Sequence, residues 1–216
     1  MSGTKLPVGG GLSSRRVDVA AAVAALARGE IVAYPTETSY GLAVDAFSTA
    51  ALDRLFALKG RGAEKTFSVI VAPVEGAGAR MIDTLVAEVP PAAERLMAKF
   101  WPGPLTLVLP ARSDLPAALV NNGFVAVRES PHPLARALAA GLGRAITATS
   151  ANPAGQPAAR SAEEVAAALP DGCWILDGGS VPGGTPSTLV RVTPTGLEIV
   201  RAGLISAEAL AQEVSR

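Results

Sequence analysis

The stretch IVAYPTETSYGL occupies residues 31–42 and joins an apolar run to a polar one. Its first part, IVAY, predicts a buried strand, and Pro35 is expected to stop it because proline lacks the N–H that a strand ladder needs. The polar residues Thr36, Glu37 and Thr38 would then lie in a loop, where they can contact a small substrate or simply form a turn. Polar residues gather in the same way at three further places in the chain.

Strands and helices follow one another in an irregular order. Capping residues and apolar spacing predict helices over 17–28, 49–59, 91–100 and 133–141, a helix starting at SAEE (161–164), and a final helix in ISAEALAQEV (205–214). Apolar runs predict further strands over 67–72, 105–110, 125–128, 145–149, 173–177, 187–192 and 197–201. Because strands and helices do not alternate strictly, we expect an α+β (mixed α/β) domain around one large twisted sheet.

The composition fits one folded domain. The chain has 216 residues, 49% of them hydrophobic, and its 19 Lys and Arg residues balance its 19 Asp and Glu residues. An apolar chain without net charge is not intrinsically disordered, and its balanced charge argues against a dominant nucleic-acid footprint. We expect residues 1–15 to form a flexible N-terminal tail and residues 16–216 to form a single domain.

Neither a membrane span nor a secretory leader is visible. No apolar run approaches the roughly 18 residues of a membrane span, and the segment MSGTKLPVGGGLSSRR lacks the apolar core of a signal peptide. The single cysteine, Cys173, cannot form an internal disulfide and is expected to be inert core. A reducing, cytoplasmic location without a membrane partner fits these features.

Three more polar clusters could carry chemistry. KGRGAEK (59–65) holds three cations and two glycines, which suits a polyphosphate, although the end of a helix also favours cations. TSANPAG (149–155) supplies a hydroxyl and an amide that can bond phosphate or ribose, or form an ordinary turn. GGTPST (183–188) directly precedes a predicted strand.

Two arginines and one histidine stand near predicted strand ends. Arg128 could clamp a carboxylate or form a surface ion pair, and Arg201 could contact a ligand or be simply exposed. His132, the only histidine, lies between two prolines, so a structural role is favoured over a catalytic one.

Several mechanisms lack the residues that they need. Lys65-Thr66 is preceded by Glu64, so there is no Walker A motif, and neither a G-x-S-x-G elbow nor a G-x-G-x-x-G fingerprint after a strand is present. One histidine and one cysteine leave little material for a protein metal site or for Cys–His catalysis. A pocket of cations, hydroxyls and glycine-rich backbone remains, which suits nucleotide transfer by positioning and charge stabilisation.

The clusters, in this order, resemble the YrdC-like family of threonylcarbamoyl-adenylate synthases. The matching segments span about residues 17–206: PTETSYGL, KGR at 59–61, WPGPLTLVLP at 101–110, VAVR at 125–128 with HP at 132–133, TSAN at 149–152, PST at 186–188 and VRAGLIS at 200–206. The resemblance implies a twisted mixed sheet, flanked by helices, around a concave and positively lined cavity. It also implies that L-threonine, bicarbonate and ATP are converted into L-threonylcarbamoyl-AMP and pyrophosphate. A t6A-pathway transferase complex would then pass the threonylcarbamoyl group to position 37 of tRNA.

The resemblance also implies roles for single residues. Lys59 and Arg61 match the family's K-x-R pair, which binds ATP phosphates, and we expect both to be catalytic. Further positions match those beside ATP, namely Lys65, Ser150, Asn152 and Arg201. Those that match the threonine site are Thr38, Arg128 and Ser187. The implied reaction needs no protein nucleophile; Lys59, Arg61 and a Mg2+ ion would stabilise the charge at the α-phosphate.

The sequence departs from the family pattern in places, and other functions stay open. Gly62 replaces a frequent proline, and Ile70 stands where some members have a histidine. Glu129 beside Arg128 could weaken a carboxylate clamp or merely point away. One alternative is a YrdC-like paralogue that handles another carbamoyl adenylate. The other is a non-catalytic module that binds RNA or tRNA, which predicts salt-dependent RNA affinity without ATP turnover.

Overall fold

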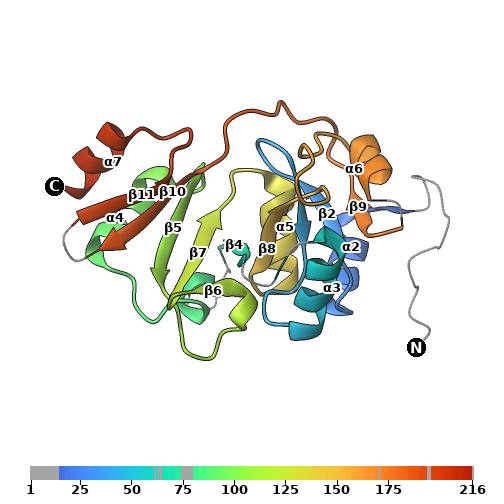
Figure 1. Ribbon diagram of the computed structural model, residues 1–216, viewed down its shortest axis with the longest axis horizontal. Coiled ribbons are helices and arrows are strands. Elements are labelled where there is room, and N and C mark those ends of the chain that lie inside the picture. Colours follow the sequence, from blue (N-terminus) through green and yellow to red (C-terminus); the bar gives the residue numbers. More distant parts are fainter. Residues whose placement is uncertain are drawn as a thin grey trace.

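The computed structural model describes residues 15–60, 62, 65–73, 80–169, 171–193 and 196–215. Its strands are β1 (Arg16–Val17), β2 (Val32–Pro35), β3 (Tyr40–Ala43), β4 (Ser68–Val71), β5 (Leu105–Pro110), β6 (Val120–Asn121), β7 (Phe124–Glu129), β8 (Ile146–Ser150), β9 (Trp174–Leu176), β10 (Thr188–Thr193) and β11 (Gly196–Arg201). Within these residues they form one sheet in the order β1-β9-β2-β3-β8-β4-β7-β5-β10-β11, and β6 pairs with β7 (Figure 1).

The sheet is mixed, as the irregular order of elements predicted. The pairs β2–β9, β4–β7 and β5–β10 are parallel, whereas β3–β8, β4–β8 and β5–β7 are antiparallel. Strands distant in sequence are therefore neighbours at its centre, where β8 lies between β3 and β4. Loops that follow different strands can thus meet around one site.

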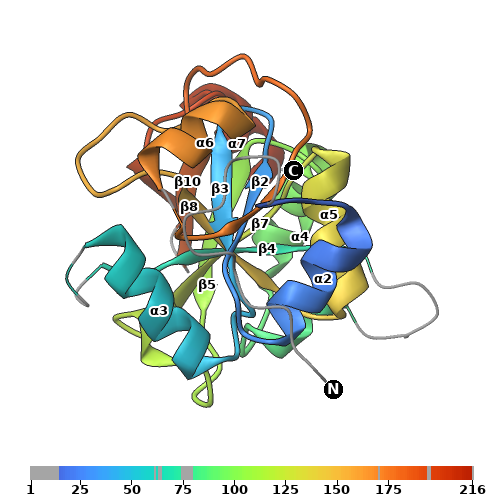
Figure 2. The ribbon, with the colours of Figure 1, turned by 90° about the vertical axis from the view of Figure 1, so that its right-hand side faces the viewer.

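Six α-helices cover the sheet in the described part of the chain. They are α2 (Val19–Ala27), α3 (Thr49–Lys59), α4 (Pro91–Phe100), α5 (Pro133–Leu142), α6 (Ala162–Ala168) and α7 (Ala207–Val214); two 3-10 turns span Met81–Thr84 and Ala117–Leu119. α2 and α5 pack together on one side of the molecule and α3 lies on the other (Figure 2). α4 and α7 lie together at the β10–β11 end, and α6 lies beside β9 at the opposite end (Figure 1). None of the helices in the described residues has the length and hydropathy required for a membrane span.

The capping residues predicted from the sequence are in place. The Ser48 hydroxyl accepts from the Ala51 amide at 3.3 Å to begin α3, and Gly60 ends this helix in the left-handed region with φ of 59°. Ser161 caps α6 in the same way. These local signals set the bounds of α3, and thereby place Lys59 as its last residue.

Three strands were missed by the sequence analysis: the short strands β1 and β6, and β3 at the centre of the sheet. PTETSYGL was expected to be a loop, but Tyr40–Ala43 forms β3, which pairs antiparallel with β2. The intervening turn is closed by the Thr36 amide and hydroxyl, which both donate to the Ser39 carbonyl, at 3.0 and 2.6 Å. The polar residues of this segment therefore stand at the tip of a hairpin.

The predicted tail needs a correction at its last residue. Residues 1–14 lie outside the described residues, but Arg15 is buried and its guanidinium donates to the Leu169 carbonyl at 2.9 Å. β1 follows at once and pairs with β9. The hydrogen-bonded fold thus begins at or before residue 15.

Cys173 is fully buried, as expected of a core residue. Burial raises the pKa of its thiol to about 12. Because the thiolate is the reactive form, this cysteine is chemically inert in the folded protein.

Candidate functional site

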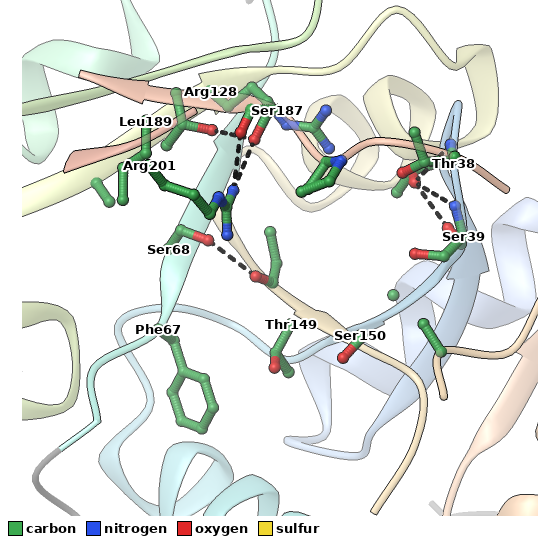
Figure 3. Close-up of a pocket in the computed structure, with 18 of the residues that line it drawn as sticks. Thr38, Ser39, Phe67, Ser68, Arg128, Thr149, Ser150, Ser187, Leu189 and Arg201 are labelled. Atoms are coloured by element: carbon green, nitrogen blue, oxygen red, sulfur yellow. Dashed lines mark hydrogen bonds between the residues drawn. The ribbon is translucent and has the colours of Figure 1, made fainter. Parts of the chain in front are cut away.

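A cavity of about 700 Å³ opens at the centre of the sheet. Thr38 and Ser39, from the β2–β3 turn, line one side, and Arg128, Ser187, Leu189 and Arg201 line the other (Figure 3). Phe67, Ser68, Thr149 and Ser150 lie between the two sides, on or next to β4 and β8 (Figure 3). The volume falls within the roughly 300–1,000 Å³ that small-molecule and cofactor sites occupy.

The charged residues that line the cavity are all cations. They are Arg128 from β7, Arg201 from β11 and Arg160 from the segment before α6; no described lining residue is a carboxylate. Such a cavity favours an anionic ligand. The expectation of a positively lined cavity is confirmed for the described residues.

Arg128 is held by a carboxylate behind the cavity wall. It is 9% exposed, and its Nη1 donates to Glu37 Oε1. The hydroxyl of Ser130, a fully buried residue, donates to Glu37 Oε2 at 3.0 Å. The guanidinium is therefore fixed before any ligand binds, with its charge compensated by Glu37.

Glu37, and not Glu129, is the acidic neighbour of Arg128. The sequence left open whether Glu129 weakens the clamp or merely points away. Successive side chains of a strand point to opposite faces, so Glu129 points away from Arg128. Burial raises the pKa of Glu129, and the charge of Arg136 opposes this increase.

Arg201 is held by a neutral residue, since both acceptors of its guanidinium belong to Ser187. Its Nη2 donates to the Ser187 carbonyl at 3.0 Å and to the Ser187 hydroxyl at 3.2 Å (Figure 3). Ser187 Oγ in turn lies 2.8 Å from Thr106 Oγ1. Burial and then the nearby charge of Arg128 lower the pKa of Arg201. Both guanidinium groups belong to residues that line this side of the cavity.

Lys59 occupies a different place from the one expected. It is 4% exposed, does not line the cavity, and its Nζ donates to Asn152 O at 2.6 Å, Ser150 O at 2.7 Å and Asn152 Oδ1 at 2.8 Å. A buried ammonium must satisfy its three N–H groups, and these three acceptors do so. Lys59 therefore holds the loop that presents Ser150 and does not line the cavity.

Asn152 belongs to the same buried network. It is 6% exposed, its Oδ1 accepts from the Ser150 hydroxyl at 2.5 Å, and its Nδ2 donates to Gln156 O. Ser150 lines the cavity, whereas Asn152 does not.

The remaining expected residues divide into three cases. Thr38 lines the cavity, and its amide donates to the Thr36 hydroxyl at 3.4 Å. Lys65 is exposed and does not line the cavity. Arg61 lies outside the described residues.

His132 has a structural role, as the sequence favoured. It is the N-cap of α5, and its Nδ1 accepts from the Leu134 amide at 3.3 Å. Burial lowers the pKa of the imidazole, which favours the neutral form that can accept this bond.

The sequence analysis missed several lining residues. Ser68, on β4, lines the cavity and its hydroxyl donates to the Ala148 carbonyl at 2.8 Å (Figure 3). Arg160 stands next to the capping box SAEE and could have been noticed only as a cation near the TSAN loop. In the described residues, no three His, Cys, Asp or Glu side chains are grouped to hold a metal ion.

Comparison with known sequences gives consistent relatives. The sequence model of the Sua5, YciO and YrdC family, described as telomere recombination, matches residues 24–203. A threonylcarbamoyl-AMP synthase of Bacillus subtilis is 38% identical over 91% of this chain and 56% of its own length. One of Chromohalobacter salexigens is also 38% identical, over 79% of this chain and 90% of its own length. The chain thus spans about half the length of some relatives and nearly all of others.

Solved structures agree with this. A crystal structure of P. abyssi Sua5 complexed with L-threonine superposes with a TM-score of 0.82, at 34% identity, over 92% of this chain and 59% of that one. E. coli YciO, at 22% identity and a TM-score of 0.74, shares the fold over 90% of this chain and 96% of its own. With the family's sequence matched along most of the chain and its fold reproduced around a cationic cavity, this chain belongs to the Sua5/YciO/YrdC family.

Proposed function

We propose that this protein is a threonylcarbamoyl-AMP synthase, which converts L-threonine, bicarbonate and ATP into L-threonylcarbamoyl-AMP and pyrophosphate. Relatives of that name, 38% identical over 79–91% of the chain, support the proposal, as does a Sua5 neighbour complexed with L-threonine. The observation that carries it is the cavity, where a compensated arginine and an uncompensated one stand on one side and hydroxyls on the other.

Arg128 and Ser187 would bind the carboxylate of threonine. Arg128 presents a planar fork that matches a carboxylate, and the ion pair with Glu37 fixes its orientation in advance. Thr38, on the opposite side, would contact the amino group (Figure 3). Because Glu37 balances the charge of Arg128, Arg128 would hold the carboxylate mainly through the direction of its N–H groups.

ATP would occupy the part of the cavity near Ser150 and Arg201. Lys59 and Asn152 would act as positioning residues here, since their hydrogen bonds hold Ser150. Arg61 and Lys65 are proposed as phosphate contacts on the resemblance alone.

The reaction balances without a protein nucleophile. The amine of threonine adds to CO2 derived from bicarbonate and releases a proton, which leaves a carbamate. A carbamate oxygen attacks the α-phosphorus, the bond from that phosphorus to the bridging oxygen of the β-phosphate breaks, and pyrophosphate leaves. Arg201 and Arg61 would stabilise the developing negative charge.

Magnesium would enter as part of the nucleotide substrate. The described residues group no three metal-ligating side chains, and Glu37, which adjoins the lining residue Arg128, is engaged by Arg128 and Ser130. A resident protein site for Mg2+ does not fit these residues, so we assign the ion to Mg·ATP.

The product would be used in tRNA modification. We propose that a t6A-pathway transferase complex moves the threonylcarbamoyl group to position 37 of tRNA, and that the protein works in the cytoplasm. The activated carbamoyl-adenylate bond is chemically suited to such a transfer.

The test measures pyrophosphate release from Mg·ATP and bicarbonate with each amino acid in turn. Release should require both threonine and bicarbonate, and mass spectrometry should identify the adenylate. Arg128→Gln should raise the KM for threonine about tenfold or more, whereas Arg112→Gln, at a surface pair with Asp114, should change nothing.

The other outcomes separate the alternatives. Binding of ATP without release, whatever the amino acid, would indicate a paralogue with another carbamoyl substrate. Salt-dependent RNA binding with no affinity for ATP would instead support an RNA-binding module.

A further inference from the structure

Arg160 is a cavity arginine to which neither the motifs nor the relatives assign a role. Its backbone is fixed on both sides: its amide donates to Glu164 Oε2 at 2.7 Å, and its carbonyl accepts from the Val181 amide at 2.9 Å. These bonds tie it to the start of α6 and to the linker between β9 and β10. The base of the side chain is therefore held at the cavity.

The guanidinium of Arg160 lies against a glycine of that linker. A Cβ at Gly183 would come within 2.9 Å of Arg160 Cδ and 3.2 Å of Nη1, and Gly183 has φ of +77°. The backbone conformation favours glycine there, and a Cβ would displace the Arg160 side chain. Arg160 and Gly183 both line the cavity, so the linker leaves room for the arginine at its edge.

Arg160 differs from Arg128 in its partners. Arg128 has an ion pair with Glu37, whereas among the described residues no carboxylate or carbonyl accepts from the Arg160 guanidinium. Arg201 donates only to a carbonyl and a neutral hydroxyl. The cavity thus contains two arginines whose guanidinium groups form no ion pair with a described carboxylate, and it suits a ligand part with at least two negative charges.

The two uncompensated arginines flank one short run of chain. Arg160 contacts Gly183, and Arg201 is bonded to Ser187, four residues further on. An extended run of that length spans at most about 14 Å. Long arginine side chains can therefore reach the same polyphosphate from either end of it.

We propose that Arg160 binds the polyphosphate of ATP, and the pyrophosphate product, together with Arg201. The inference rests on the proposed function, since it assigns a further contact within the same site. Arg160 is placed on the phosphates and not on threonine because the latter carries a single carboxylate, for which Arg128 is already oriented.

The test compares equilibrium binding of inorganic pyrophosphate, adenosine and L-threonine by calorimetry. Arg160→Gln should weaken pyrophosphate about tenfold and leave adenosine and threonine unchanged, because glutamine removes the charge and the fork. The pyrophosphate affinity of Arg160→Lys should lie between that of the wild type and that of Arg160→Gln. Added salt should reduce the difference in pyrophosphate affinity between the wild type and Arg160→Gln. Arg112→Gln serves as the control, since it removes an equal charge from a surface pair away from the cavity.

Melting curves keep a folding defect apart from a binding defect. Because the Arg160 guanidinium has no partner in the described fold, both variants should have the melting temperature of the wild type. If Arg160→Gln melts at a lower temperature, the pyrophosphate affinity of Arg160→Lys is used as the test instead. Pyrophosphate binding unchanged in the variants, or a loss that falls on threonine, would overturn the inference while the synthase proposal stands. A folded wild type that binds neither ATP nor pyrophosphate would overturn the proposed function, and the inference with it.

Discussion

Replacing Lys59 by methionine distinguishes a phosphate contact from a positioning residue. Methionine keeps the length and the apolar stem of lysine and removes the ammonium. Lys59 is 4% exposed and donates to three acceptors in the loop that carries Ser150. We therefore expect the substitution to affect stability as well as turnover.

The expected loss of stability depends on whether each acceptor of Lys59 keeps another hydrogen-bond donor. Ser150 O still accepts from the Asn152 amide at 3.0 Å, and Asn152 Oδ1 still accepts from the Ser150 hydroxyl at 2.5 Å. Asn152 O loses its donor, and a buried unsatisfied carbonyl costs about 1–3 kcal/mol. The loss of two further charge-assisted bonds adds to this, and release of a buried ammonium offsets part of it, so we expect the free energy of unfolding to fall by about 2–4 kcal/mol.

Urea unfolding of Lys59→Met and Lys99→Met measures this difference directly. Lys99 is the matched control because it is also in the last turn of its helix, α4, but is exposed. Its replacement should change the free energy of unfolding by less than about 0.5 kcal/mol. If Lys59 served only to bind phosphate, its removal would leave stability unchanged or increase it, so a loss below about 0.5 kcal/mol in Lys59→Met would refute the reasoning.

His132, Cys173 and Gly203 each give a prediction of their own. Burial lowers the pKa of His132 from 6.5, so the unfolded chain takes up its proton more readily than the folded protein as the pH falls from 6.5 toward the lowered pKa. The free energy of unfolding should therefore fall over that range. His132→Asn, which keeps a capping acceptor, should flatten that dependence in urea titrations and retain turnover. Cys173, with a pKa of about 12, should resist iodoacetamide at pH 8 until urea unfolds the protein, as mass spectrometry would show. Gly203→Ala places a Cβ 2.4 Å from Thr188 N, so it should destabilise the fold by about 2–3 kcal/mol in urea and raise the KM for threonine by displacing Ser187.

Most elements could be predicted because their signals are local. Ser48 and Gly60 delimit α3 by capping, and the apolar run 105–110 is β5 with the same bounds. The strand β3 could not be predicted in this way. Tyr40–Ala43 is short and follows a polar turn, and its strand state comes from pairing with β2 and with the distant β8.

Five of the residues predicted for the site line the cavity, and their roles there stay predictions. Thr38, Ser150, Ser187, Arg128 and Arg201 all line it, because strand ends are where the sheet presents side chains to a ligand. The prediction did not anticipate how the charges are compensated. Glu37 and Arg128 are 91 residues apart in sequence, and only the packing of the β2–β3 turn against β7 brings them together.

Lys59, which the sequence analysis singled out, and Arg160, which it did not mention, show what a motif leaves undetermined. A cation in a glycine-rich segment looks available for phosphate, yet burial obliges Lys59 to satisfy its ammonium within the protein. Arg160 lies in a segment without a motif, yet its exposed guanidinium reaches the cavity without an internal partner in the described fold. Residue type states which ligand a side chain could bind, whereas the partners that folding supplies decide whether it remains available. If Lys59→Met loses stability and Arg160→Gln loses pyrophosphate, charge compensation, and not the motif alone, assigns the phosphate contacts of this cavity.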